Sequence, residues 1–296
     1  MAALEDKLKG WTGPSSDTEQ KKQERTVRMI REAVESHSAF KGCSLKVYAK
    51  GSYANNTNVR SDSDVDIAVQ CTNLFYWEED ASGANVPGES YKGPWTSSAL
   101  RSELKAALEE KFTGQVDSSG STAFRINSSS ARVEADVVPC FDFRHYFSSG
   151  TYREGSKVFK TDGSSLINYP EQQRTNGVAK NKRTNLCYKQ AVRIMKRLEN
   201  AMVDDDAHRE VPSFFIECLV YYVPDSVLTR STWTDTVKGI ISHVFHELDG
   251  PEPDQESARW LEVNQCKFLF APGQKWSRED ARAFMKAGWN YLGFKS

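Results

Sequence analysis

Residues 51–69 of the chain read GSYANNTNVRSDSDVDIAV, and this stretch carries the strongest structural signal in the sequence. The segment before it, residues 44–50, alternates apolar and polar side chains and predicts a half-buried strand. Residues 64–69 predict a second strand. Side chains two positions apart on a strand point to the same face, so Asp64 and Asp66 project together. We therefore expect a pair of carboxylates on one face of a sheet.

The carboxylate pair predicts a divalent metal site, because two adjacent negative charges repel unless a cation lies between them. Magnesium prefers a few carboxylates together with substrate phosphates. A carboxylate on a neighbouring strand would complete a site for two metal ions, and Asp136 in the run ADVV is the best candidate. Glu134 shares that strand face and is the main alternative. We expect two Mg²⁺ ions as cofactors, with Mn²⁺ as the alternative.

Gly51 and Ser52 suit phosphate binding, because glycine allows close backbone approach and a serine hydroxyl can bond a phosphate oxygen. Asp64-Val-Asp66 alone is weaker evidence, since such pairs also occur at solvated strand ends and in calcium-binding turns. The combination of a strand, Gly-Ser, the paired carboxylates and a further acid in an apolar strand arises much less often by chance.

The sequence pattern of residues 1–175 predicts helices mixed with strands. A helix over residues 17–37 begins at Asp17 as N-cap, with Gln20 three residues later. Residues 72–96 are rich in polar residues, Gly and Pro and predict a surface excursion. Further elements are a helix carrying Leu100, Leu104, Leu108 and Phe112, strands over 123–127 and 131–138, the second limited by Pro139, and a hairpin over 157–167 around Asp162-Gly163.

The sequence pattern of the remaining residues predicts helices. A short basic run, Lys180, Lys182 and Arg183, comes just before the first of them. We place these helices near residues 184–203, 213–223, 233–249, 256–264 and 277–292. The prediction is an α+β fold of two lobes with a cleft between them. Residues 1–175 form a core lobe with a mixed central sheet, and residues 176–296 form a helical lobe that contributes to nucleotide binding.

Charge and composition narrow the class of protein. Lys plus Arg is 39 and Asp plus Glu is 40, so the basic excess typical of duplex-binding proteins is missing and a small substrate is favoured. The six cysteines form no CxxC pair, which predicts reduced thiols and no structural zinc. No apolar stretch is long enough for a membrane span or a signal core, so we expect a cytoplasmic protein without a membrane partner.

The pattern of Gly-Ser, the Asp64–Asp66 pair and Asp136 resembles the signature of the polymerase-β-type nucleotidyltransferase superfamily. Within it, the chain is similar to the bacterial cyclic-oligonucleotide synthases related to cyclic GMP-AMP synthase and oligoadenylate synthase, the cGAS/DncV-like nucleotidyltransferases. Two later segments carry this similarity: AVRIMK at 191–196 and VPSFFIE at 211–217. The resemblance implies a polymerase-β-like core lobe.

The resemblance also implies roles for residues of the helical lobe. Arg193 and Lys196 would neutralise phosphates, Ser213 would bond them, and Phe214 would stack on a base where relatives often have Tyr. Ser213 follows Pro212 at a predicted helix N-terminus, which attracts anions in any case. From spacing alone, Arg193 and Lys196 could be ordinary solvated helix residues, and Phe214 could be a core residue.

The implied activity is metal-dependent synthesis of cyclic di- or oligonucleotide second messengers from nucleoside triphosphates, ATP among them, in antiphage defence. Partners would be regulatory proteins of a defence operon, with no obligatory nucleic acid, because the Cys/His zinc thumb that senses DNA in animal relatives is missing. Two alternatives stay open. One is a template-independent RNA-tailing or linear 2′–5′ oligoadenylate synthase, and the other is an inactive transferase fold that serves as a regulatory binding module.

Overall fold

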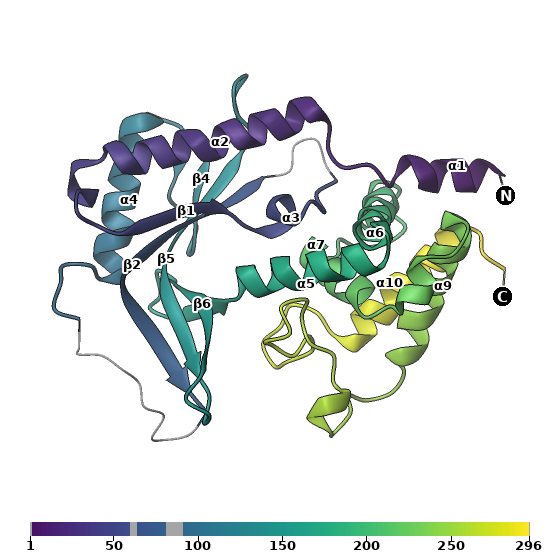
Figure 1. The fold of residues 1–296 in the computed structure, drawn as a ribbon. Coiled ribbons are helices and arrows are strands. Elements are labelled where there is room, and N and C mark those ends of the chain that lie inside the picture. The colour runs from purple at the N-terminus through teal and green to yellow at the C-terminus, as the bar shows by residue number, and fades with distance from the viewer. Residues whose placement is uncertain (1, 60–63, 81–90, 296) are drawn as a thin grey trace. The chain divides into compact units, whose positions relative to one another are not determined.

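The computed structural model describes residues 2–59, 64–80 and 91–295 (Figure 1). By contacts within the chain it divides into two compact units. One unit contains residues 16–53 and 60–170 and holds the sheet, and the other contains residues 1–15, 54–59 and 171–296 and is helical. The residues before Ser16 and a short stretch around Asn56 therefore pack with the helical unit.

The sheet unit is built on a mixed seven-stranded sheet with the order β1-β2-β5-β4-β3, in which β6 pairs with β5 and β7 with β6. β2 and β5 are the central parallel pair, and the other pairings are antiparallel. The bounds are β1 Leu45–Ala49, β2 Val65–Glu79, β3 Val116–Asp117, β4 Phe124–Ile126, β5 Ala135–Tyr146, β6 Tyr152–Phe159 and β7 Ser165–Asn168.

Two long helices, α2 (Asp17–Ser36) and α4 (Ser97–Lys111), pack against this sheet (Figure 1). Ile30 of α2 and Leu104 of α4 share one buried cluster with Ile67 of β2 and Val137 of β5. Strand side chains alternate between faces, so the even-numbered residues of β2 near Asp66 lie on the face away from this cluster. The short elements of this unit are the 3₁₀ helix η1 (Ser38–Phe40) and α3, which spans Gly51–Ala54 and extends to the unit boundary.

The helical unit packs around one large apolar core, in which Leu198, Phe215, Ile240 and Phe284 are fully buried. Its helices are α1 Ala2–Gly10, α5 Pro170–Arg183, α6 Cys187–Asp204, α7 Ser213–Tyr221, α8 Asp225–Leu228, α9 Trp233–Glu247 and α10 Arg278–Tyr291, with the 3₁₀ helix η2 at Glu256–Ala258. In the described part of the chain, no helix is both long and apolar enough to cross a membrane.

The fold class agrees with the α+β prediction, but several element boundaries do not. β2 continues to Glu79, so the first part of the predicted surface excursion is strand, and residues 81–90 of that excursion lie outside the described residues. β5 runs through Pro139 instead of ending there. β4 pairs with β5 only as far as Val137 and β6 pairs from Phe141 onwards, so Pro139 lies in the gap between these two ladders.

Three predictions about helices were also wrong. α2 is capped by Ser16, whose hydroxyl accepts from the Glu19 backbone N–H, rather than by Asp17 with Gln20. The basic run ending at Arg183 is the last turn of α5, a helix that the sequence reading missed. Residues 256–264 contain only a single 3₁₀ turn, η2.

Candidate active site

The predicted carboxylates lie on the two central strands. Asp66 of β2 and Asp136 of β5 are direct partners in the parallel register. Both project from the face of the sheet opposite α2 and α4, because their neighbours Ile67 and Val137 point into the helix-covered core. Asp64 immediately precedes β2. The strand pairing therefore brings together two acids that are 70 residues apart in the sequence.

The surroundings of Asp64 and Asp66 disfavour the negative charge of these two carboxylates. Burial, with the nearby charges of Glu134 and Asp136, raises the pKa of Asp64 to about 6. Burial also raises the pKa of Asp66, against the opposing effect of Lys50. Several acids therefore crowd one site without enough cationic charge to balance them, as expected where a cation or a substrate-bound metal belongs.

Position 51 requires a glycine, because the Asp66 side chain lies close to its backbone. Its φ of +68° is a backbone conformation that favours glycine, and a Cβ at this position would collide with the Asp66 carboxylate. The chain turns here from β1 into α3, with Ser52 as the second residue of that helix. Gly51 thus lies beside the Asp66 carboxylate, and phosphate binding by Gly51 and Ser52 stays a prediction.

Two basic residues beside the carboxylates were missed by the sequence analysis. Lys50 Nζ lies 3.9 Å from Asp66 Oδ1. Arg125 of β4 places Nε 3.2 Å from Glu134 Oε1 and 3.6 Å from Asp136 Oδ1. Lys50 is adjacent to Gly51 and could have been noticed, whereas Arg125 reaches the site only through the β4–β5 pairing.

The donor set suits magnesium chemically. Carboxylate oxygens crowded by like charge are hard ligands, and magnesium typically combines one or two of them with substrate phosphates and waters. Within residues 2–59, 64–80 and 91–295, no three His, Cys, Asp or Glu side chains already converge as a metal site. Arg125 contacts both Glu134 and Asp136, so its contacts do not distinguish these two candidates.

A polar cavity of about 610 Å³ opens beside Asp64 and Glu134. Its other walls carry hydroxyl, basic and acidic side chains from the start of α2 and from the loop before β5, among them Ser16, Glu19, Lys22 and Arg132. Such a volume is typical of small-molecule sites. The sequence analysis did not single out Arg132, because it expected residues 131–138 to be strand, whereas β5 begins only at Ala135 and Arg132 lies in the loop before it.

Comparisons with known proteins show which family the chain belongs to. Residues 175–293 match the family model of the cGAS/DncV-like nucleotidyltransferase C-terminal helical domain. The cyclic dipyrimidine nucleotide synthase CdnE of Legionella pneumophila is 35% identical over 298 residues, which cover 97% of this chain and 97% of that protein. The chain belongs to the cGAS/DncV-like nucleotidyltransferases. The family predicted from the motifs is thereby confirmed.

Two further relatives support this nucleotidyltransferase assignment over the whole chain. A cyclic dipurine nucleotide synthase of Elizabethkingia meningoseptica is 33% identical and covers 100% of both chains. The solved structure of the Rhodothermus marinus CdnE c-UMP-AMP synthase with Apcpp and Upnpp superposes with a TM-score of 0.84 at 29% identity, covering 99% of this chain and 98% of that one. The predicted enzyme class and fold are confirmed.

In the helical unit of this nucleotidyltransferase, the two predicted phosphate-binding cations have protein partners. Arg193 of α6 is 5% exposed and donates to the backbone oxygens of Thr12 (2.6 Å) and Asn56 (2.7 Å). Lys196 is 1% exposed, donates to Thr57 O at 3.1 Å, and lies 3.7 Å from the Glu217 carboxylate. Phosphate binding by either residue stays a prediction, and it would require these contacts to be exchanged.

The two remaining predicted contacts lie at the start of α7. Ser213 is its first residue, so the predicted helix N-terminus is where we expected it. Phe214 is half-buried against the helical core, with its ring centroid 6.3 Å from that of Trp276. Its packing agrees in part with the alternative that it is a core residue, and stacking on a base stays a prediction.

Proposed function

We propose that this nucleotidyltransferase joins nucleoside triphosphates into a cyclic di- or oligonucleotide at Asp64, Asp66 and Asp136. The observation that carries the proposal is the register of the central strands, which makes Asp66 and Asp136 direct neighbours beside Gly51. The raised pKa of Asp64 supports it, because it indicates a site short of positive charge.

In the proposed reaction, a ribose hydroxyl of one nucleotide attacks the α-phosphorus of a second, pyrophosphate leaves, and the hydroxyl proton is released. Two Mg²⁺ ions, when bound, would lower the pKa of that hydroxyl and offset charge on the leaving group. Asp64, Asp66 and Asp136 would hold them. A second transfer within the linear intermediate would close the ring.

Other residues of the sheet unit would bind and orient the nucleotides. Lys50 and Arg125 hold the Asp66 and Asp136 carboxylates, and each can turn towards a phosphate as the metals are bound. The Ser52 hydroxyl would bond a phosphate oxygen, and the 610 Å³ cavity beside Asp64 is large enough for part of a nucleotide. Ser213 and Phe214 stay as predicted contacts to phosphate and base.

The product is proposed to be a second messenger in antiphage signalling in the cytoplasm, with regulatory proteins as partners. The bases are not determined by overall similarity, because the relatives at 35% and 33% identity are a dipyrimidine and a dipurine synthase. ATP is our expectation for one of the substrates.

The test is to incubate the full chain and Mg²⁺ with each pairwise mixture of the four ribonucleoside triphosphates, then treat with phosphatase and identify products by mass. We expect a phosphatase-resistant cyclic product without added DNA or RNA. A parallel reaction contains an RNA primer. Elongation of that primer without a cyclic species in any mixture would refute the proposal and favour RNA tailing.

A further inference from the structure

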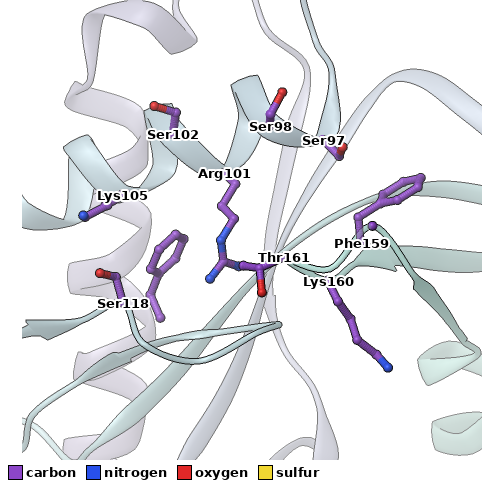
Figure 2. Close-up of a pocket in the computed structure, with 11 residues that line it drawn as sticks. Ser97, Ser98, Arg101, Ser102, Lys105, Ser118, Phe159, Lys160 and Thr161 are labelled. Carbon is purple, nitrogen blue, oxygen red and sulfur yellow. The ribbon is translucent and has the colours of Figure 1, made fainter.

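A second cavity in the sheet unit, of about 520 Å³, lies between the start of α4, the loop after β3 and the β6–β7 turn (Figure 2). Ser98, Arg101 and Lys105 line it from a single face of α4, and Lys160 and Thr161 line it from the turn. The Thr161 N–H donates to Ser121 O at 3.1 Å, which ties this turn to the loop after β3. None of the catalytic carboxylates lines this cavity.

Arg101 lines this cavity with a guanidinium group that is only partly hydrogen-bonded. Nη2 donates to Gly120 O at 2.6 Å, and the guanidinium lies 4.5 Å from the centre of the Phe124 ring. Nη1 is buried and has no hydrogen-bond partner in the part of the chain that the structure describes. Burial lowers the pKa of Arg101. A buried N–H donor without a partner is costly, and an anion that reached it from the cavity would remove that cost.

The other charges around the cavity leave it cationic. Lys105 pairs with Glu109 at 3.5 Å on the surface of α4, which is a weak interaction for exposed groups. Lys160 lies near Asp162, whose carboxylate is already bonded by Ser164. Figure 2 shows the Arg101 side chain reaching in between the α4 side of the cavity and Thr161. Ser97, Ser102 and Ser118 also line the cavity, and their hydroxyl groups can donate to an anion.

The alternation of β4 separates this cavity from the carboxylates. Phe124 lines the cavity and belongs to the core cluster on the helix-covered face of the sheet. The next residue, Arg125, points to the opposite face and contacts Asp136. A ligand in the cavity would therefore contact the face of the sheet that the reacting nucleotides do not occupy.

We propose that this cavity binds the phosphate groups of a small phosphorylated molecule, at a site separate from the catalytic carboxylates. Arg101, two lysines and several hydroxyls present many donors, and with the Nη1 atom of Arg101 left unpaired they suit a group with three or more acceptor oxygens. The volume lies in the range of small-molecule sites, which favours a metabolite over a macromolecule.

The test uses inorganic pyrophosphate as the probe and the full chain in EDTA, so that catalysis is not needed. Hydrogen–deuterium exchange is followed in peptides covering residues 97–105, 118–124 and 159–164, and affinity is measured by calorimetry. The pocket variant is Lys105→Gln with Lys160→Gln. The matched control is Lys41→Gln with Lys295→Gln, which removes the same charge from two exposed lysines outside the cavity.

We expect pyrophosphate to slow exchange in these peptides of the wild type and of the control. The pocket variant should lose that protection and bind about ten-fold or more weakly at this site. Arg101→Lys, which keeps the charge but loses the fork, should weaken binding while the protein stays folded by circular dichroism. Unprotected peptides in the wild type, equal binding by the pocket variant, or equal protection by sodium sulfate would each overturn the assignment. Because no turnover is measured, failure here is distinct from failure of the proposed function.

Discussion

Asp64 is the residue whose environment has the clearest consequence for metal binding. Its pKa is raised to about 6 by burial and by the charges of Glu134 and Asp136, so it holds a proton in the folded state at pH values where the unfolded chain would have lost it. In the metal-free protein, ionisation of Asp64 therefore lowers the free energy of unfolding as pH rises from about 4 towards about 6. A bound cation removes that penalty.

The pH dependence of metal affinity follows from this raised pKa. We expect Mn²⁺ affinity to be constant well above pH 6 and to fall up to about ten-fold for each pH unit below it, because the proton competes with the metal. Calorimetric titrations between pH 5 and pH 8 measure this. The Asp64→Asn variant should bind more weakly with less dependence on pH. A wild-type affinity that is flat from pH 5 to pH 7 would contradict the role of Asp64 as a ligand.

Strand register, more than side-chain contacts, distinguishes Asp136 from Glu134 as the candidate metal ligand. Both lie near Arg125, but only Asp136 is the direct partner of Asp66. We expect Asp136→Asn to lower the rate of product formation by more than about 100-fold, whereas Glu134→Gln lowers it by less than about 10-fold. Initial rates of pyrophosphate release compare the two. A severe Glu134→Gln defect beside an active Asp136→Asn variant would exchange their roles.

Gly51 provides a test of the close approach between the Gly-Ser turn and Asp66. Gly51→Ala should displace the Asp66 carboxylate and reduce activity more than about ten-fold, in addition to roughly 1–2 kcal/mol of backbone strain. Gly42→Ala is the matched control, because Gly42 also has a positive φ, +81°, but nothing lies within 4 Å of its added Cβ. Thermal melts and turnover are measured for both. Equal activity losses in the two variants would mean that backbone strain alone is responsible.

At the scale of elements, α6 and α7 are joined by a buried ion pair. Lys196 of α6 and Glu217 of α7 are 1% and 2% exposed and lie 3.7 Å apart. Thr57 completes the network by donating to Glu217 at 2.9 Å and accepting from Lys196. Burial lowers the pKa of Lys196, and Glu217 opposes this effect. The network links α6 and α7 within the helical unit, whatever role Lys196 has in phosphate binding.

Lys196→Met should therefore reduce stability as well as activity. We expect it to cost about 3–5 kcal/mol, because it leaves the Glu217 carboxylate buried without its cation. Lys196→Met combined with Glu217→Leu should recover most of that loss. Urea unfolding of the wild type, both single variants and the double variant gives the coupling. A Lys196→Met cost below about 1 kcal/mol would show that Lys196 acts mainly on the ligand.

Elements with strong local patterns could be predicted, and those set by distant contacts could not. The Leu100–Leu104–Leu108 spacing predicted α4, and the Asp162-Gly163 turn predicted the β6–β7 hairpin. Pro139 was expected to end its strand, but the gap between two neighbouring ladders accommodates it. α5 was missed because its exposed, polar residues carry little apolar periodicity.

At the scale of the whole molecule, the acids of the site could be predicted and their surroundings could not. Asp64, Asp66 and Gly51 lie in one continuous stretch, so strand alternation predicts one face for the two acids, although β2 itself begins at Val65. Arg125 and the cavity wall at Arg132 depend on how β4 and the following loop fold onto β5, which no local pattern indicates. The similarity to the Legionella pneumophila synthase extends over 97% of both chains, so the comparison covers both units.

Nucleotidyl transfer at the paired carboxylates is tested most directly with the variant Asp64→Asn combined with Asp66→Asn. Neutralising both acids removes charge while keeping the shape of each side chain. With Mg²⁺ and the preferred nucleotide mixture, we predict that pyrophosphate release and phosphatase-resistant product fall below detection. The thermal melting temperature should be unchanged or higher, since carboxylate crowding is relieved. A folded double variant that turns over at near the wild-type rate would contradict the account.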